Sequence, residues 1–275
     1  MRVEKRHSSP ACAAIHAITA ARPGNRYAGS QTGVSYAMTS SSYQIIVRNL
    51  SQTTQYFYLF QKQAAFPSLV SPSVFSSSLG SQSVGNYGNS GAQINFGLDR
   101  QIYAGALSTM QSAPSSQLIA LIALDATTRS IVTSTTAARA ITLTTASGEP
   151  NNCTSLTLDP LGLSAPAYQS GVPVGAFAMN VPTYTPLPAP ELYCGVAALN
   201  NDQAIILSSF VAPVPNAVMN CIPQQIFFVK TSYQPAGTVV PYDETNAARC
   251  DFSTGYGTYT VTYNADGTFS ATGGP

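Results

Sequence analysis

Two short groups of residues combine carboxylates with tyrosine, a pairing that can move protons. Carboxyl and phenol groups act as general acids and bases when a pocket shifts their pKa values toward neutrality. These groups are therefore the candidate catalytic residues of the chain. They are Asp99 with Tyr103, and Tyr242, Asp243 and Glu244 with Arg249.

Each group also has a purely structural interpretation, which we favour. Asp99 follows an expected strand and precedes Arg100, so its side chain can bond to its own backbone in a turn. Asp243 and Glu244 lie between expected strands and suit a loop or a helix cap.

Other catalytic and cofactor chemistry finds no support in the sequence. The chain has two histidines, His7 and His16, and both precede the expected domain, which excludes a Ser-His-Asp or Cys-His site inside it. We find no nucleophile elbow, phosphate-binding loop or zinc-protease motif. The glycines from Gly85 to Gly91 lack a strand-to-helix setting and predict a flexible turn. We expect no cofactor and no metal.

Charge argues against a nucleic-acid partner. Charged residues form 8% of the chain, and from Met38 onward seven basic residues stand against ten acidic ones. Phosphate backbones are bound by clustered Lys and Arg, which this part lacks. No run reaches the roughly 18 apolar residues of a membrane span, so we do not expect an integral membrane protein.

The first part of the chain differs from the rest. Residues 1–42 are basic and then alanine-rich, without strand alternation. We treat them as an N-terminal extension, either a disordered tail, a secretory or mitochondrial targeting segment, or residues before a true start at Met38. Whether residues 1–37 belong to the mature protein stays open, as does location, with the cytoplasm favoured over secretion.

Four cysteines fall within the expected domain and are widely spaced, unlike zinc ligands. They could form disulfides in a secreted protein or act as small buried hydrophobic residues in the cytosol. Two sequons, at Asn49 and Asn152, would be glycosylated only on a secretory route. The cysteines are Cys153, Cys194, Cys221 and Cys250.

Alternation of apolar and polar residues predicts an all-β protein. Tyr43 to Arg48 and Tyr56 to Phe60 alternate and predict an opening hairpin. Residues 66–92 are rich in Ser, Gly and Pro and predict a long ordered loop or short edge strands. Residues 93–98 predict a third strand.

Further strands follow along the chain. Residues 117–124 are apolar and fit a buried strand or a short helix, while 130–145 are β-branched and predict strand. A strand is also expected at 174–179, inside a proline-rich stretch. Residues 195–210 predict a hairpin, and other strands are expected at 225–231 and, as a second hairpin, at 259–272.

These elements predict a single β-sandwich or jelly-roll-like domain of antiparallel strands at residues 43–275. We found no repeat and no charge run that would divide it.

Three stretches together resemble the rhizosphere-induced (RhiA-like) family of small proteins. They are Tyr43-Gln-Ile-Ile-Val-Arg-Asn with Tyr56-Phe-Tyr-Leu-Phe-Gln, then Gln93 to Tyr103, and Val174 to Met179. Members usually carry tryptophans in the middle stretch, where this chain has Phe96 and Tyr103. The resemblance implies a compact β-sandwich, cytosolic or exported, and assigns no functional residue.

Three functions remain open. The first is a non-enzymatic binding or self-associating β-sandwich, with a small molecule or a glycan as ligand, or a homo-oligomer. The fifteen tyrosines could stack on a sugar, although tryptophan is absent. The second is a cofactor-independent cyclase or isomerase that uses the carboxylates and tyrosines named above. The third is a lipid-binding or pore-forming β protein.

Overall fold

The computed structural model describes residues 42–108, 137–148, 151–186, 192–202 and 204–274, which all belong to one compact unit spanning Met38 to Pro275. Their regular elements are nearly all strands, which confirms the all-β class. In chain order the elements are β1 (Ser42–Asn49), β2 (Gln55–Gln61), β3 (Phe75–Val84), α1 (Tyr87–Ser90), β4 (Ile94–Asp99), β5 (Ile102–Ser108), β6 (Ala137–Ile141), β7 (Cys153–Leu158), β8 (Leu161–Leu163), β9 (Phe177–Asn180), β10 (Leu192–Leu199), β11 (Ile205–Val211), β12 (Val218–Cys221), β13 (Ile226–Thr231), β14 (Val239–Val240), β15 (Ala248–Asp251), η1 (Phe252–Thr254), β16 (Thr258–Tyr263) and β17 (Phe269–Gly274).

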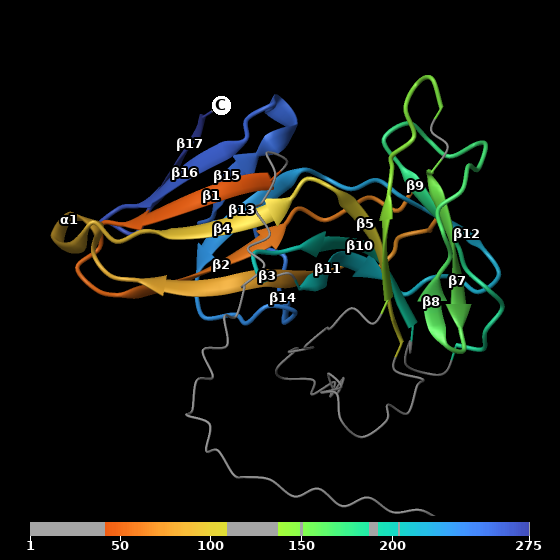
Figure 1. Cartoon of the computed structure of the whole chain (residues 1–275). Helices are drawn as coiled ribbons and strands as arrows, with labels where there is room; N and C mark the ends of the chain where they lie inside the picture. The colour runs from red at the N-terminus through yellow and green to blue at the C-terminus, as the bar shows by residue number, and fades with distance from the viewer. Residues whose placement is uncertain (1–41, 109–136, 149–150, 187–191, 203, 275) are drawn as a thin grey trace, which may run out of the picture. The chain divides into compact units, whose positions relative to one another are not determined.

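The strands form three sheets (Figure 1). One has the order β17-β16-β1-β4, and another the order β12-β9-β7-β8. The large sheet runs β15-β13-β2-β3-β11-β10-β5-β6, with β14 beside β3. Most pairs are antiparallel as expected, but β1 with β16 and β7 with β9 are parallel. Parallel neighbours need a long connection, and a distant partner of this kind leaves no local signal in the sequence.

Two hydrophobic cores hold the small sheets against the large one. The first joins β1, β4 and β16 to β2, β3 and β13. The second joins β7, β8, β9 and β12 to β5, β6 and β10. Cys194 and Val196 of β10 enter the second core, while Ala198 enters the first. Alternate residues of a strand share a face, so both small sheets cover the same face of the large sheet.

The expected opening hairpin is wrong. β1 and β2 exist where the alternation predicted them, but β1 pairs with β4 and β16 whereas β2 pairs with β3 and β13. Residues 50–54 therefore carry the chain from one layer to the other. Both faces of β2 are buried, since Phe57 enters the first core and Phe60 packs on the opposite face.

The expectation of a long loop or short edge strands at residues 66–92 is wrong for residues 75–84. β3 is ten residues long and lies inside the large sheet. Three of its serines, Ser76 to Ser78, are buried, and the Ser78 hydroxyl donates from Oγ to the Gln234 carbonyl at 2.8 Å. The glycine-rich turn forms α1, capped by Asn86 and ended by Gly91 at a φ of 67°.

The remaining predicted elements have mixed outcomes. The third strand, the β10–β11 hairpin, β13 and the β16–β17 hairpin are confirmed. The strand expected at 174–179 begins only at Phe177, and of 130–145 the structure describes a strand at β6. Residues 117–124 and 1–41 lie outside the described residues.

All four cysteines of this unit are free and buried, so they pack as small hydrophobic residues. The two sequon asparagines are also fully buried. Asn49 donates from Nδ2 to the carbonyls of Thr53 and Val84, at 2.8 and 3.0 Å. Asn152 donates to Thr144 Oγ1 and to the Gln169 carbonyl. Both amides serve the fold, and neither site can carry a glycan in the folded protein.

Candidate functional site

The first predicted group is brought together at the turn between β4 and β5. Tyr103 donates from Oη to Asp99 Oδ2 at 2.9 Å, and the Gln101 amide donates to Asp99 Oδ1 at 3.0 Å. The second bond is the turn interaction that we expected for Asp99. Both carboxylate oxygens are thus engaged within the turn.

This arrangement suppresses proton transfer by Tyr103. Burial, and next the hydrogen bond to Asp99, raise the pKa of Tyr103 to about 12. A general acid or base works best with a pKa near the operating pH. Tyr103 therefore stays protonated at neutral pH and stabilises the turn. Beside it, the Arg100 guanidinium lies 4.9 Å from the centre of the Tyr43 ring, a cation–π contact.

The second predicted group lies on the other face of the large sheet from the two main cores. Lys230 of β13 donates from Nζ to Asp243 Oδ2 at 2.5 Å. The amide and the hydroxyl of Thr245 donate to Asp243 Oδ1 at 2.9 and 2.6 Å. The bond from Lys230, followed by those from Thr245, holds the pKa of Asp243 well below its usual value. Asp243 is an ionised loop residue, as the structural interpretation predicted.

Glu244 has a different partner from its neighbour. The Tyr242 hydroxyl donates to Glu244 Oε1. Burial, and next this hydrogen bond, raise the pKa of Tyr242 above its usual value. The Tyr242 ring packs edge-on against Phe60 and Phe228, with ring centres 6.1 and 6.5 Å apart. Tyr242 covers an aromatic core and keeps its proton.

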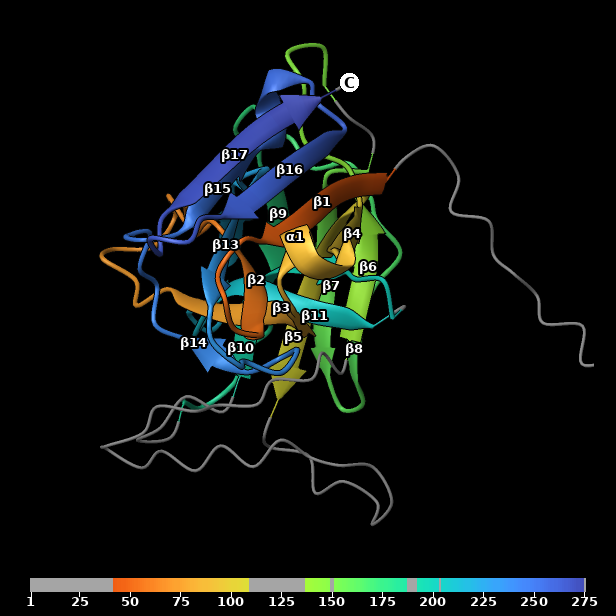
Figure 2. The ribbon, with the colours of Figure 1, turned by 90° about the vertical axis from the view of Figure 1, so that its left-hand side faces the viewer.

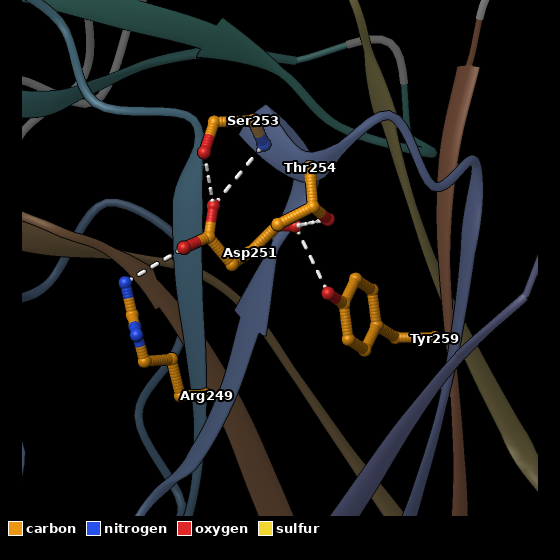
Figure 3. Close-up of polar contacts among 5 residues, drawn as sticks. All are labelled: Arg249, Asp251, Ser253, Thr254 and Tyr259. Atoms are coloured by element: carbon orange, nitrogen blue, oxygen red, sulfur yellow. Dashed lines mark hydrogen bonds and ion pairs between the residues drawn. The ribbon is translucent and has the colours of Figure 1, made fainter.

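Arg249 pairs with Asp251 and not with Asp243 or Glu244 of its predicted group. Figure 3 shows Arg249 Nη2 donating to Asp251 Oδ2, at 2.7 Å. The other Asp251 oxygen accepts from the Ser253 amide and hydroxyl, while the Asp251 carbonyl accepts from Tyr259 Oη at 2.9 Å. Asp251 caps η1. Arg249 therefore belongs to a structural cluster that ties β15 to β16.

No hydrogen bond or ion pair joins the two candidate groups within the part of the chain that the structure describes. Asp99 lies in a small sheet, whereas Asp243 follows β14 of the large one. The same described residues hold no cluster of three His, Cys, Asp or Glu side chains suited to a metal. They also include no helix long and apolar enough to cross a membrane.

A small cleft lies between β3, β4 and the turn that joins β10 to β11. Its volume is about 40 Å³, and Leu79, Phe96 and Asn200 contribute to its walls. Neither Asp99 nor Asp243 reaches it. A site for an organic ligand has a volume of about 300–1,000 Å³, so this cleft holds no more than a few water molecules.

Sequence reasoning missed an exposed pair of tyrosines. Tyr56 of β2 and Tyr233, just after β13, have ring centres 5.2 Å apart at 70°. Their exposed fractions are 48% and 61%. The Ser232 amide donates to the Tyr56 carbonyl at 3.0 Å, which fixes the loop that carries Tyr233. Tyr56 was visible in a predicted strand, but no local pattern marked Tyr233 as its neighbour.

Neutral hydrogen-bonding groups surround this pair. Ser83 is the cross-strand neighbour of Tyr56, and Ser232 is exposed beside Tyr233. The Gln234 amide group donates from Nε2 to Ser232 Oγ at 3.4 Å. We call Tyr56, Ser83, Ser232, Tyr233 and Gln234 the tyrosine patch. It presents aromatic rings, hydroxyls and an amide, without a charge.

Comparisons with known proteins do not place the chain in a family. No protein-family model matches it, and no curated protein or solved structure does. The resemblance to the rhizosphere-induced family therefore stays a prediction.

Proposed function

We propose that this protein is a non-enzymatic binding protein and that its ligand contacts the tyrosine patch. The observation that carries the proposal is the exposed pair Tyr56 and Tyr233, held at 5.2 Å by a strand and an anchored loop. Tyrosine offers a large rigid surface at low conformational cost, which is why it is enriched in binding surfaces. Two fixed and exposed rings form a prepared contact area.

The chemistry around the rings favours a neutral, polyhydroxylated ligand, that is, a glycan. Sugar rings have an apolar face that packs on an aromatic ring and hydroxyls that exchange hydrogen bonds with serine and amide groups. The patch supplies both kinds of group and no charge. The nearest cation along β13, Lys230, is paired with Asp243.

The candidate acid-base residues lend no support to the enzymatic alternative. The carboxylates of Asp99 and Asp243 accept local hydrogen bonds, and Tyr103 and Tyr242 are held protonated. The cleft lined by Leu79, Phe96 and Asn200 is too small for an organic substrate. The lipid-binding or pore-forming alternative stays a prediction that a liposome leakage assay can test.

Titration calorimetry with neutral oligosaccharides tests the proposal. The probes are the hexasaccharides of β-1,4-glucose, β-1,3-glucose and β-1,4-N-acetylglucosamine. We expect at least one to bind, and we expect Tyr233→Ala to weaken that binding about tenfold, which corresponds to ~1.4 kcal/mol for a lost stacking surface.

Tyr168→Ala is the matched control, because Tyr168 has the same exposed fraction of 61% and lies outside the patch. Its affinity should equal that of the wild type. The proposal fails if none of the probes binds at millimolar concentration, or if both variants lose affinity equally.

A further inference from the structure

β17 forms the outer edge of its four-stranded sheet. It pairs with β16 on one side, and it is last in the sheet order (Figure 2). Its residues are Phe-Ser-Ala-Thr-Gly-Gly, with the three from Ser270 to Thr272 exposed. The strand contains no charge and no proline. Such an edge is a ready template for another strand.

The pairing with β16 determines which backbone groups of β17 face outward. The Asn264 amide donates to the Thr268 carbonyl at 2.8 Å, so this facing pair is hydrogen-bonded. Hydrogen-bonded and non-bonded pairs alternate along an antiparallel ladder. From the observed register, Phe269, Ala271 and Gly273 are non-bonded toward β16. Their amides and carbonyls therefore point to the side of β17 opposite β16, in the plane of the sheet.

Two other edges carry charges that discourage pairing. β15, at one end of the large sheet, contains the exposed Arg249 and its partner Asp251. β6, at the other end, carries Arg139, whose Nη2 donates to the Leu163 carbonyl of β8. Charged side chains are a common protection of edge strands.

The remaining edges are short or covered. β8 has three residues and β14 has two. In β12 the backbone amide of Asn220 donates to Ser68 Oγ at 2.8 Å, so this group of the edge already has a partner. β4 is bridged at Leu98 to Asn200. Among the described sheet edges, β17 alone combines six residues with no charge and no bridge on its outer side, and β15 of the large sheet lies close to it without pairing.

We propose that β17 binds β17 of a second copy of this chain, antiparallel, about a twofold axis at Ala271. In this register Ala271 faces its equivalent, and Phe269 faces Gly273, so all the outward groups of these residues find partners. Ser270 then lies opposite Thr272 of the second copy, and hydroxyl pairs of this kind stabilise facing strands. The β17-β16-β1-β4 sheets of the two copies then join into one continuous sheet of eight strands.

A second copy fits this edge because the strand is self-complementary and uncharged. Like charges facing each other oppose pairing, and β17 brings none to the axis. The whole chain has a net charge of +1, so long-range repulsion between copies is small. The contact involves few residues, so we expect a dissociation constant of about 0.1–1 mM, in the range of small transient interfaces.

Matched substitutions at Ala271 and Ala236 test the proposal in the full-length chain. Ala236 is exposed in a loop that precedes β14. In sedimentation equilibrium up to ~1 mM, we expect the wild type and Ala236→Lys to show an average mass that rises with concentration. Ala271→Lys should remain monomeric, because two lysines would face each other across the axis.

Cysteine cross-linking tests the register, with Cys12→Ser as the background. Facing residues in a strand pair lie within disulfide reach, so Ala271→Cys should form a covalent dimer at least tenfold faster than Ala236→Cys. Circular dichroism checks that each variant is folded. Equal cross-linking rates, a monomeric wild type at ~1 mM, or unchanged association of a folded Ala271→Lys would each overturn the proposal.

Discussion

The crossing from β1 to β2 depends on one buried amide, so Asn49→Ala should destabilise the fold far more than its size suggests. Asn49 is fully buried at the end of β1. Its Nδ2 donates to the Thr53 and Val84 carbonyls, and its Oδ1 accepts from the Ser51 amide and hydroxyl at 2.9 and 2.7 Å. These bonds close the connection between the two layers and hold the end of β3.

The magnitude follows from the groups left without a partner. The Val84 carbonyl is buried, and an unsatisfied buried acceptor costs about 1–3 kcal/mol. The bonds to Thr53 and Ser51 are partly exposed, and their loss adds about 0.5–1 kcal/mol together. We therefore expect Asn49→Ala to lower the free energy of unfolding by about 1.5–4 kcal/mol, or the melting temperature by roughly 3–16 °C.

Urea unfolding followed by circular dichroism measures the change. Asn89→Ala is the control, since Asn89 is exposed in α1 and the hydrogen bond recorded for it uses its backbone amide. That variant should lie within about 0.5 kcal/mol of the wild type. A loss below 1 kcal/mol for Asn49→Ala would refute the assigned role of the amide.

Three other predictions concern packing, titration and thiol reactivity. Gly195→Ala should lower the free energy of unfolding in urea by about 3 kcal/mol or more, because a Cβ there would lie 2.2 Å from the Ser209 backbone oxygen of β11. Gly80→Ala should be tolerated, because the nearest atom to a Cβ there is a ring carbon of Phe96 at 3.8 Å. In Asp99→Asn the pKa of Tyr103 should fall below about 12 yet stay above its usual value, because burial raises it more than the hydrogen bond to Asp99 does. NMR titration of the Tyr103 ring measures this pKa, and an unchanged value would contradict the hydrogen bond from Tyr103 to Asp99. The raised pKa favours the protonated native state, so the stability it contributes is present below pH 10 and is lost as pH rises toward 12. In Cys12→Ser, a thiol reagent should modify none of the four buried cysteines until urea unfolds the protein, and fast reaction in the native state would show that they are accessible.

Particular candidate residues were predictable because their interactions are local. Asp99 was expected to bond within its own turn, and it accepts from Gln101 two residues away. Asp243 was expected in a loop, and Thr245 bonds to it at the same spacing. The partner of Arg249 was not predicted although it is also close: Asp251 lies two residues along β15, on the same face of the strand.

The sequence by itself determined the class of the fold and the faces of several strands. Alternation at Ile45 and Val47, and at Tyr259 and Val261, marks buried faces because side chains of a strand alternate whatever its partner is. The turn residues between β16 and β17 likewise specify a hairpin through local backbone geometry. Both signals are read within a few residues.

Only the tertiary structure decided which strands are neighbours. The parallel pair β1 and β16 joins opposite ends of the unit. Ser78 of β3 is an interior residue whose hydroxyl donates to the Gln234 carbonyl, 156 residues away in the sequence. The pairing of Tyr56 with Tyr233 depends in the same way on β2 lying beside β13. Partner choice is set by the packing of whole sheets over two cores, and no short window of sequence contains that information.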